Sequence, residues 1–177
     1  FLSTNLQAIE ADTHAHWQNW LASGVQFSCP DPDYTALLQR GLLGTALHLD
    51  GKNGGIIAGM HNGAYPYVWP RDGAWAAITL ARAGFVDEAR EIVRFLRDIT
   101  FRDVEGWARK GFWKQKYTTD GYIIWANPQV DETSCFPWMT RYIYDVEGDV
   151  NFLDLNYDEV YEAALASSQD STIDAQL

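Results

Sequence analysis

The sequence has few cysteines and no long hydrophobic run. Its 177 residues include two cysteines, Cys29 and Cys135, too few for a thiolate metal site or a framework of several disulfides. They are either two buried thiols, which we favour, or one bridge. A helix that crosses a bilayer needs about 20 consecutive apolar residues, and no apolar run comes near that length. We therefore expect no membrane partner.

Basic residues are also scarce. The chain has 13 Lys and Arg against 24 Asp and Glu, a formal net charge of -11. Binding to nucleic acid needs clustered Lys and Arg that neutralise phosphates, so no nucleic-acid partner is predicted. The four histidines, His14, His16, His48 and His61, lack metal-ligand spacing, and no metal or other cofactor is predicted. A neutral ligand such as a sugar is compatible with this charge.

Strand-like alternation is almost absent, and apolar residues instead recur at helical spacing. Gly24 and Gly84 are placed to end helices. The segment 101–127 carries several Trp, Tyr and Gly residues and is expected to be a long irregular loop. Helices are predicted over Ser3–Leu21, Pro32–Leu49, Arg71–Ala83, Ala89–Ile99, Phe136–Tyr144 and Tyr157–Leu165.

Two of these helices show a clear apolar stripe. The stripe of the second consists of Leu38, Leu42, Ala46 and Leu49, and that of the fourth, whose outward positions are charged, of Ala89, Ile92, Val93, Leu96 and Ile99. Pro137 falls where the fifth helix should be under way, so this helix either begins near Phe136 with Pro137 in its first turn or is kinked.

A weak internal repeat links Trp69–Asp72 to Asn127–Asp131, roughly 60 residues further on. Each segment ends an aromatic loop, and each is followed by a helix, a tight turn and a second helix. Repeating such hairpins around an axis gives a helical toroid whose inner-helix N-termini meet at one end. The sequence therefore predicts an all-α fold of about three hairpins, part of a toroid.

The chain is rich in aromatic residues, with 8 Trp and 9 Tyr. Their flat apolar faces and polar tips suit a pyranose ring. Arg71 offers a fork of donors and Asp72 two acceptor oxygens, so together they could hold adjacent sugar hydroxyls. The alternative is that Asp72 only caps a helix and Arg71 is a surface charge, which spacing alone favours.

Two motifs carry a resemblance to a known family. Tyr65–Asp72 (YPYVWPRD) and Trp125–Glu132 (WANPQVDE) resemble the two signatures of the glucoamylase family, glycoside hydrolase family fifteen. The resemblance runs from about Trp17 to Tyr161. It implies an (α/α)6 barrel, of which this chain is about the first half, and inverting release of glucose from the non-reducing ends of α-glucans.

The resemblance also implies substrate-binding roles. Arg71 and Asp72 would hydrogen-bond the glucose in the first subsite, and this reverses the preference given above. Tyr65 would lie beside the reacting ring, where its oxygen helps to stabilise oxocarbenium character. Trp69 would either pack beneath Arg71 or contact the sugar.

The second motif supplies the wall of the implied pocket. Trp125 would line the pocket near the general acid, with Gln129 and Asp131 holding that wall. Inverting hydrolysis also needs a carboxylic acid and a carboxylate, about 6.5–9.5 Å apart. In the family both catalytic glutamates follow the second motif, and we assign no catalytic residue in this chain. Glu132 is better interpreted as a charge in the first turn of a helix.

We expect residues 1–177 to be the N-terminal part of a helical-toroid catalytic domain, with no second domain visible. Alone, it should be inactive and expose apolar faces to the missing C-terminal half of the barrel. The sequence opens at Phe1 without an initiator Met or a recognisable signal peptide, so we expect that the natural start lies upstream or was removed. An upstream β-sandwich domain, common in bacterial relatives, and an extracellular location are inferred from the resemblance alone.

Three alternatives remain open. The first is a non-catalytic sugar-binding or regulatory module on the same fold, because a fold does not fix a function. The second is another helical-toroid enzyme, such as a trehalase-like, dextran-glucosidase-like or prenyl-processing protein. The third is a purely structural helical repeat, against which the aromatic loops argue.

Overall fold

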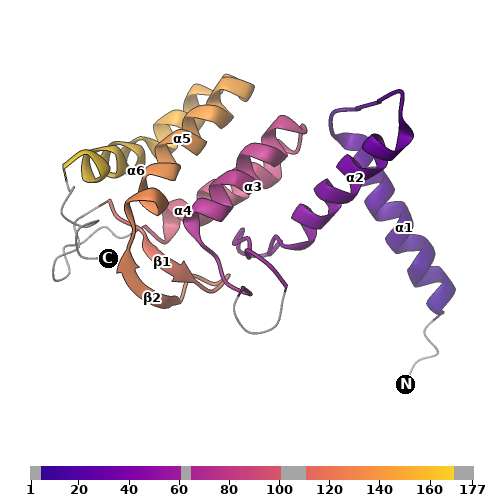
Figure 1. Cartoon of the computed structure of the whole chain (residues 1–177), viewed down its shortest axis with the longest axis horizontal. Helices are drawn as coiled ribbons and strands as arrows, with labels where there is room; N and C mark the ends of the chain where they lie inside the picture. The colour runs from indigo at the N-terminus through magenta and orange to yellow at the C-terminus, as the bar shows by residue number, and fades with distance from the viewer. Residues whose placement is uncertain (1–4, 61–64, 101–110, 170–177) are drawn as a thin grey trace.

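The computed structural model describes residues 5–60, 65–100 and 111–169, and His61 lies outside them. These residues form six helices and a two-stranded sheet, so the fold is all-α, as the sequence predicts (Figure 1). None of the described helices is long and apolar enough to cross a bilayer. The elements are α1 (Leu6–Ser23), α2 (Pro32–Leu47), α3 (Pro70–Arg82), α4 (Val86–Asp98), β1 (Lys114–Tyr117), β2 (Ile123–Pro128), α5 (Val130–Glu147) and α6 (Val150–Gln169).

Helices α3 to α6 form one packed unit. α3 packs against both α4 and α5, and α5 packs against α6. Figure 1 shows α3 and α5 side by side, both starting at the end of the unit next to the β-hairpin. This arrangement confirms the predicted order of helix, turn and helix in two successive hairpins.

Small residues on α3 allow this close packing. Ala74, Ala77 and Ala81 are buried on α3, and a Cβ at Gly73 would lie 3.4 Å from the Leu96 side chain of α4. α4 buries the predicted stripe from Ala89 to Leu96. The two helices therefore share a continuous apolar core, which adds free energy of folding in proportion to the area buried.

Helices α1 and α2 contribute much less to the core. α1 has no buried residue, and α2 buries only Leu42. Of the apolar stripe predicted on the second helix, Leu42 is buried and Ala46 and Leu49 are half-buried, whereas Leu38 is 41% exposed.

The end of α1 attaches to the turn between α3 and α4. The Trp20 ring stacks on Phe85 with centroids 3.8 Å apart, and its Nε1 donates to Glu88 Oε1 at 2.6 Å. A Cβ on Gly24 would lie only 2.5 Å from the Phe85 ring and 2.7 Å from the carbonyl oxygen of Ala83. Glycine at position 24 therefore both ends α1 and permits this contact.

Several predicted helix limits need correction. α1 starts at Leu6, after Asn5, whose side chain accepts from the Ala8 N–H at 3.2 Å, and Ser3, where the predicted helix begins, lies outside the described residues. α5 starts at Val130, well before Phe136, so Pro137 lies inside the helix and not in its first turn. α6 likewise starts at Val150. In α5, packing against α3 and α6 outweighs the loss of one backbone donor at proline.

The segment predicted as a long loop contains the β-hairpin. β1 and β2 are antiparallel, and Val68 bridges to Tyr117 in addition. Their turn passes through Asp120 and Gly121, where glycine has a φ of 87°. Trp113 and Tyr117, read from sequence as loop aromatics, are almost fully buried. Short strands of this kind carry too little alternation to be recognised against a helical background.

Candidate functional site

The candidate site is built around Arg71 in the first turn of α3. Its guanidinium faces three carboxylates: Asp131 Oδ2 lies 2.5 Å from Nη1, Glu132 Oε1 3.2 Å from Nη1, and Asp72 Oδ2 3.5 Å from Nη2. Two of these acids come from the first turn of α5. The structure thus brings the two sequence motifs into direct contact.

The alternative interpretation of Arg71 and Asp72 is wrong in its details. Trp69, and not Asp72, is the N-cap residue of α3, and it provides no side-chain cap. Partial burial disfavours the charge of Arg71, but the hydrogen bond to Asp131 and the charges of Glu132, Asp131 and Asp72 outweigh it and raise the pKa of Arg71. Arg71 therefore remains a cation held in place, and not a free surface charge.

Glu132 differs from the other two acids because it is completely buried. Its side chain is 0% exposed, whereas those of Asp72 and Asp131 are 42% and 56% exposed. Burial raises the pKa of Glu132 to about 7, although the N–H and the guanidinium of Arg71 lower it. As expected, Glu132 lies in the first turn of a helix, but it points into the protein interior.

A hollow of about 310 Å³ opens beside Arg71 and Asp72. His48 at the end of α2, Ile57 in the following segment and Trp75 on α3 also line it. The His48 ring nitrogen Nδ1 lies 2.6 Å from the carbonyl oxygen of Gly44, which fixes the ring. The volume is at the small end of the range for small-molecule sites, about 300–1,000 Å³. It would suit one sugar ring better than a chain.

The aromatic members of the predicted site form a separate group. Tyr65 and Trp69 have ring centroids 5.9 Å apart. The ammonium of Lys116 on β1 lies 5.2 Å from the Trp69 centroid and 5.5 Å from that of Trp125 on β2. It also lies 5.1 Å from the Tyr67 centroid. Such cation–π contacts fix the rings relative to one another.

The other predicted residues lie at the edges of these two groups. Tyr65 and Trp125 are 54% and 53% exposed, so much of each ring is open to solvent. Gln129 is the N-cap residue of α5 and gives no side-chain cap. Its carbonyl oxygen accepts from the Thr133 N–H at 3.2 Å, so it fixes the start of the helix that carries Asp131.

Three residues of this region were not predicted from the sequence as site residues: His48, Trp75 and Lys116. Trp75 was recognisable, because it lies three and four residues after Asp72 and Arg71 and so shares their helix face. His48 and Lys116 come close to the site only in the folded chain, and no local sequence pattern predicts this. Glu132 was noticed, but its burial could not be seen in the sequence.

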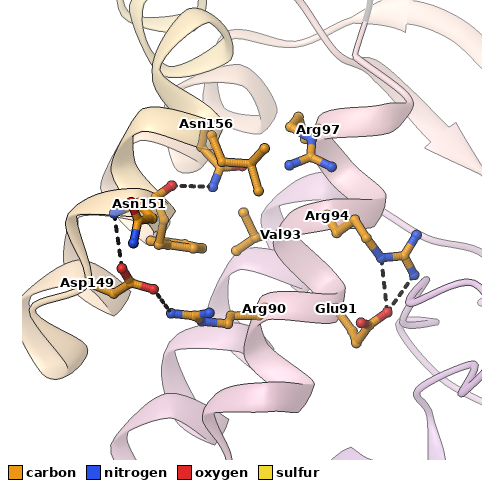
Figure 2. Close-up of a pocket in the computed structure, with 10 residues that line it drawn as sticks. Arg90, Glu91, Val93, Arg94, Arg97, Asp149, Asn151 and Asn156 are labelled. Atoms are coloured by element: carbon orange, nitrogen blue, oxygen red, sulfur yellow. Dashed lines mark hydrogen bonds and ion pairs between the residues drawn. The ribbon is translucent and has the colours of Figure 1, made fainter.

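A second hollow of about 220 Å³ lies between the outer helices α4 and α6 and shares no residue with the first. Arg90 there binds Asp149 at 2.6 Å, and Arg94 binds Glu91 at 2.5 Å (Figure 2). Arg90 also binds Glu147 at 2.9 Å, and Arg97 binds Asp98 at 3.1 Å. The charges that face this hollow are thus paired within the protein. We interpret it as a joint between α4 and the start of α6.

No family model matches this chain. Over 131 residues, or 73% of this chain, it is 30% identical to a protein of Methanocaldococcus jannaschii named as an uncharacterized glycosyl hydrolase. The chain is similar to a glycosyl hydrolase. The chain spans about a fifth (20%) of the length of that relative.

Proposed function

We propose that this chain is the sugar-binding, N-terminal part of a glucoamylase-like hydrolase. The whole protein would remove glucose from the non-reducing ends of α-glucans with inversion, on an (α/α)6 toroid. The likeness to a protein named as a glycosyl hydrolase supports the class of reaction. The two matched motifs support the finer assignment.

One observation carries the proposal. Arg71 and Asp72 line a hollow large enough for a single sugar ring, and the second motif holds Arg71 through Asp131 and Glu132. The side chain of Arg71 is 39% exposed, so part of its guanidinium can still donate to a ligand. Asp72 accepts beside it. Together they could bind two neighbouring hydroxyls in opposite hydrogen-bonding senses.

The three acids in this group are better suited to holding Arg71 than to proton transfer. Each is engaged by the same guanidinium, and general acid and base of an inverting glycosidase stand about 6.5–9.5 Å apart across the bond that is cut. The proposal therefore places the catalytic carboxyls in a later part of the full-length protein. Trp75 would add an apolar wall to the hollow. Tyr65 and Trp125 do not line it, and the sugar contacts that the resemblance implies for them stay predictions.

The first experiment measures glucose release from maltooligosaccharides by the full-length native protein, with the anomer identified by proton NMR. We expect β-glucose. Arg71→Lys keeps the charge but loses the forked geometry, so kcat/KM should fall about 10- to 100-fold, the worth of one or two charge-assisted hydrogen bonds.

Arg141→Lys is the matched control, because Arg141 makes an exposed ion pair with Asp145 on α5, with 72% of its side chain exposed. It should leave the rate unchanged. Sugar binding without hydrolysis would instead indicate a non-catalytic sugar-binding module. No response to any α-glucan, in rate or in binding, would refute the proposal.

A further inference from the structure

We infer that Glu132 is a positioning residue that fixes Arg71 from the protein interior and so sets how tightly the terminal sugar is held. This inference rests on the proposed function, because it assigns a role toward the same ligand. Both oxygens of the buried Glu132 carboxyl contact Arg71.

Glu132 holds Arg71 at both ends. Its Oε2 accepts from the backbone N–H of Arg71 at 2.5 Å, and its Oε1 lies 3.2 Å from Nη1 of the same residue. Because Arg71 is bound both at its backbone N–H and at its guanidinium, its side chain loses most of its rotamer freedom. That freedom would otherwise have to be lost when a sugar binds, which would weaken the binding.

The backbone contact also supplies a cap that α3 lacks locally. Trp69 at the N-cap offers no side-chain acceptor, and Pro70 has no N–H. The N–H of Arg71 is therefore one of the unpaired donors that every helix start presents, and Glu132 satisfies it from the neighbouring helix. The carboxyl thereby ties the start of α3 to the start of α5.

Burial shows that Glu132 acts through Arg71 and not on the sugar. Its side chain is 0% exposed, so no ligand in the hollow can reach it, while Arg71 and Asp72 remain partly exposed. Glu132 Oε1 makes no hydrogen bond within the described residues. The ion pair with Arg71 is thus the interaction that this atom provides.

The competing explanation is that Glu132 only links α3 to α5 and stabilises the fold, without positioning Arg71 for the sugar. If Glu132 only stabilised the fold in this way, its replacement would lower sugar affinity equally whether or not Arg71 is present. A positioning residue predicts that the effect disappears when its target is removed. A double-mutant cycle separates these two cases.

The test measures the dissociation constant of a thio-linked, non-hydrolysable maltoside with the full-length protein at pH 8, where Glu132 is ionised. Glu132→Gln keeps the shape and one acceptor oxygen but removes the charge. It should weaken binding about 10-fold, as expected when a charge-assisted contact is lost. In an Arg71→Ala background the same change should have less than about a 2-fold effect. Equal losses in both backgrounds, or none in the native background, would overturn the inference.

A second readout does not depend on the sugar. In NMR spectra the Nη protons of Arg71 should give separate signals in the native protein, and rotation should average them in Glu132→Gln. Separate Arg71 signals without any sugar binding would refute the proposed function alone. Sugar binding with unchanged Arg71 signals in Glu132→Gln would refute the role of Glu132.

Two further variants control the experiment. Glu91→Gln also removes a carboxylate that pairs with an arginine, Arg94, but on the outer helix α4, and it should change neither readout. If Glu132→Gln does not fold, Glu132→Asp takes its place in the cycle, since it keeps the charge but is too short to reach both ends of Arg71. The same outcomes then decide the question.

Discussion

The first two helices and the four that follow arise from similar helical patterns, yet they bury very different amounts of their surface. α1 buries no residue and α2 one, whereas α3 buries seven and α4 five. The pair α1–α2 contacts the rest of the chain through the Trp20 ring, through Leu42 in the core and through the lining of the hollow at His48. Apolar periodicity therefore predicted where helices form, but not which of them share a core.

The difference indicates what holds each region in place. In α3–α6, each helix packs an apolar face against at least one neighbour and is stabilised by it. On α1 and α2, leucines such as Leu6 and Leu38 are 77% and 41% exposed. In the proposed toroid, further hairpins would cover these faces.

The largest expected effect contrasts one leucine from each region. Leu80→Ala in α3 removes a fully buried side chain and should lower the free energy of unfolding by about 2–5 kcal/mol, through lost burial and a residual cavity. Leu38→Ala in α2 should lower the free energy of unfolding by less than about 1 kcal/mol, because this side chain is partly exposed. Urea denaturation followed by tryptophan fluorescence measures both. Equal costs would show that α2 is as well packed as α3.

A smaller effect concerns the pH dependence of stability, which we expect to reside in α3–α6. Because burial raises the pKa of Glu132 from 4.5 to about 7, the folded protein binds a proton there more tightly than the unfolded chain does. The resulting stabilisation is complete below about pH 4.5 and is lost as the pH rises through 7. Between pH 5 and 8 the loss should be on the order of 3 kcal/mol.

Comparison with Glu132→Gln isolates this contribution, since glutamine does not titrate. The groups that face Glu132 are Arg71, Asp72, Asp131, Tyr117 and Cys135. Burial raises the pKa of the Tyr117 hydroxyl, and raises that of the Cys135 thiol to about 11, so neither titrates in this range. A native protein whose stability tracks that of the variant from pH 5 to 8 would contradict the prediction.

The same contrast explains what could be predicted from the sequence. The helices of α3 and α4 were located well, because their glycine stop, apolar stripe and charged outer face all agree. The limits of α5 were missed, because a proline inside the sequence suggested a boundary that tertiary packing overrides. The β-hairpin was missed because its strands are short and its buried aromatics resemble loop residues.

The candidate site divides in the same way. Arg71, Asp72 and Asp131 were named because they belong to recognisable motifs, and the structure brings them together. The burial of Glu132 and the contact of Lys116 with three aromatic rings depend on residues that meet only after folding. Local sequence can suggest a ligand-binding residue, but not the neighbour that orients it.

The smallest expected effect tests the joint between the two regions. Trp20→Phe keeps an aromatic ring against Phe85 but removes the N–H that donates to Glu88. One charge-assisted hydrogen bond contributes about 1.5–3 kcal/mol when buried and less when half exposed, so we expect the free energy of unfolding to fall by about 1 kcal/mol.

Hydrogen exchange should accelerate in α1 while the amides of α3 and α4 stay protected, because α1 opens locally. Glu88→Gln, which keeps an acceptor oxygen at the same place, should have a smaller effect. If exchange rises equally in α1, α3 and α4, the joint belongs to one cooperative unit, and the proposed separation of the two regions is wrong.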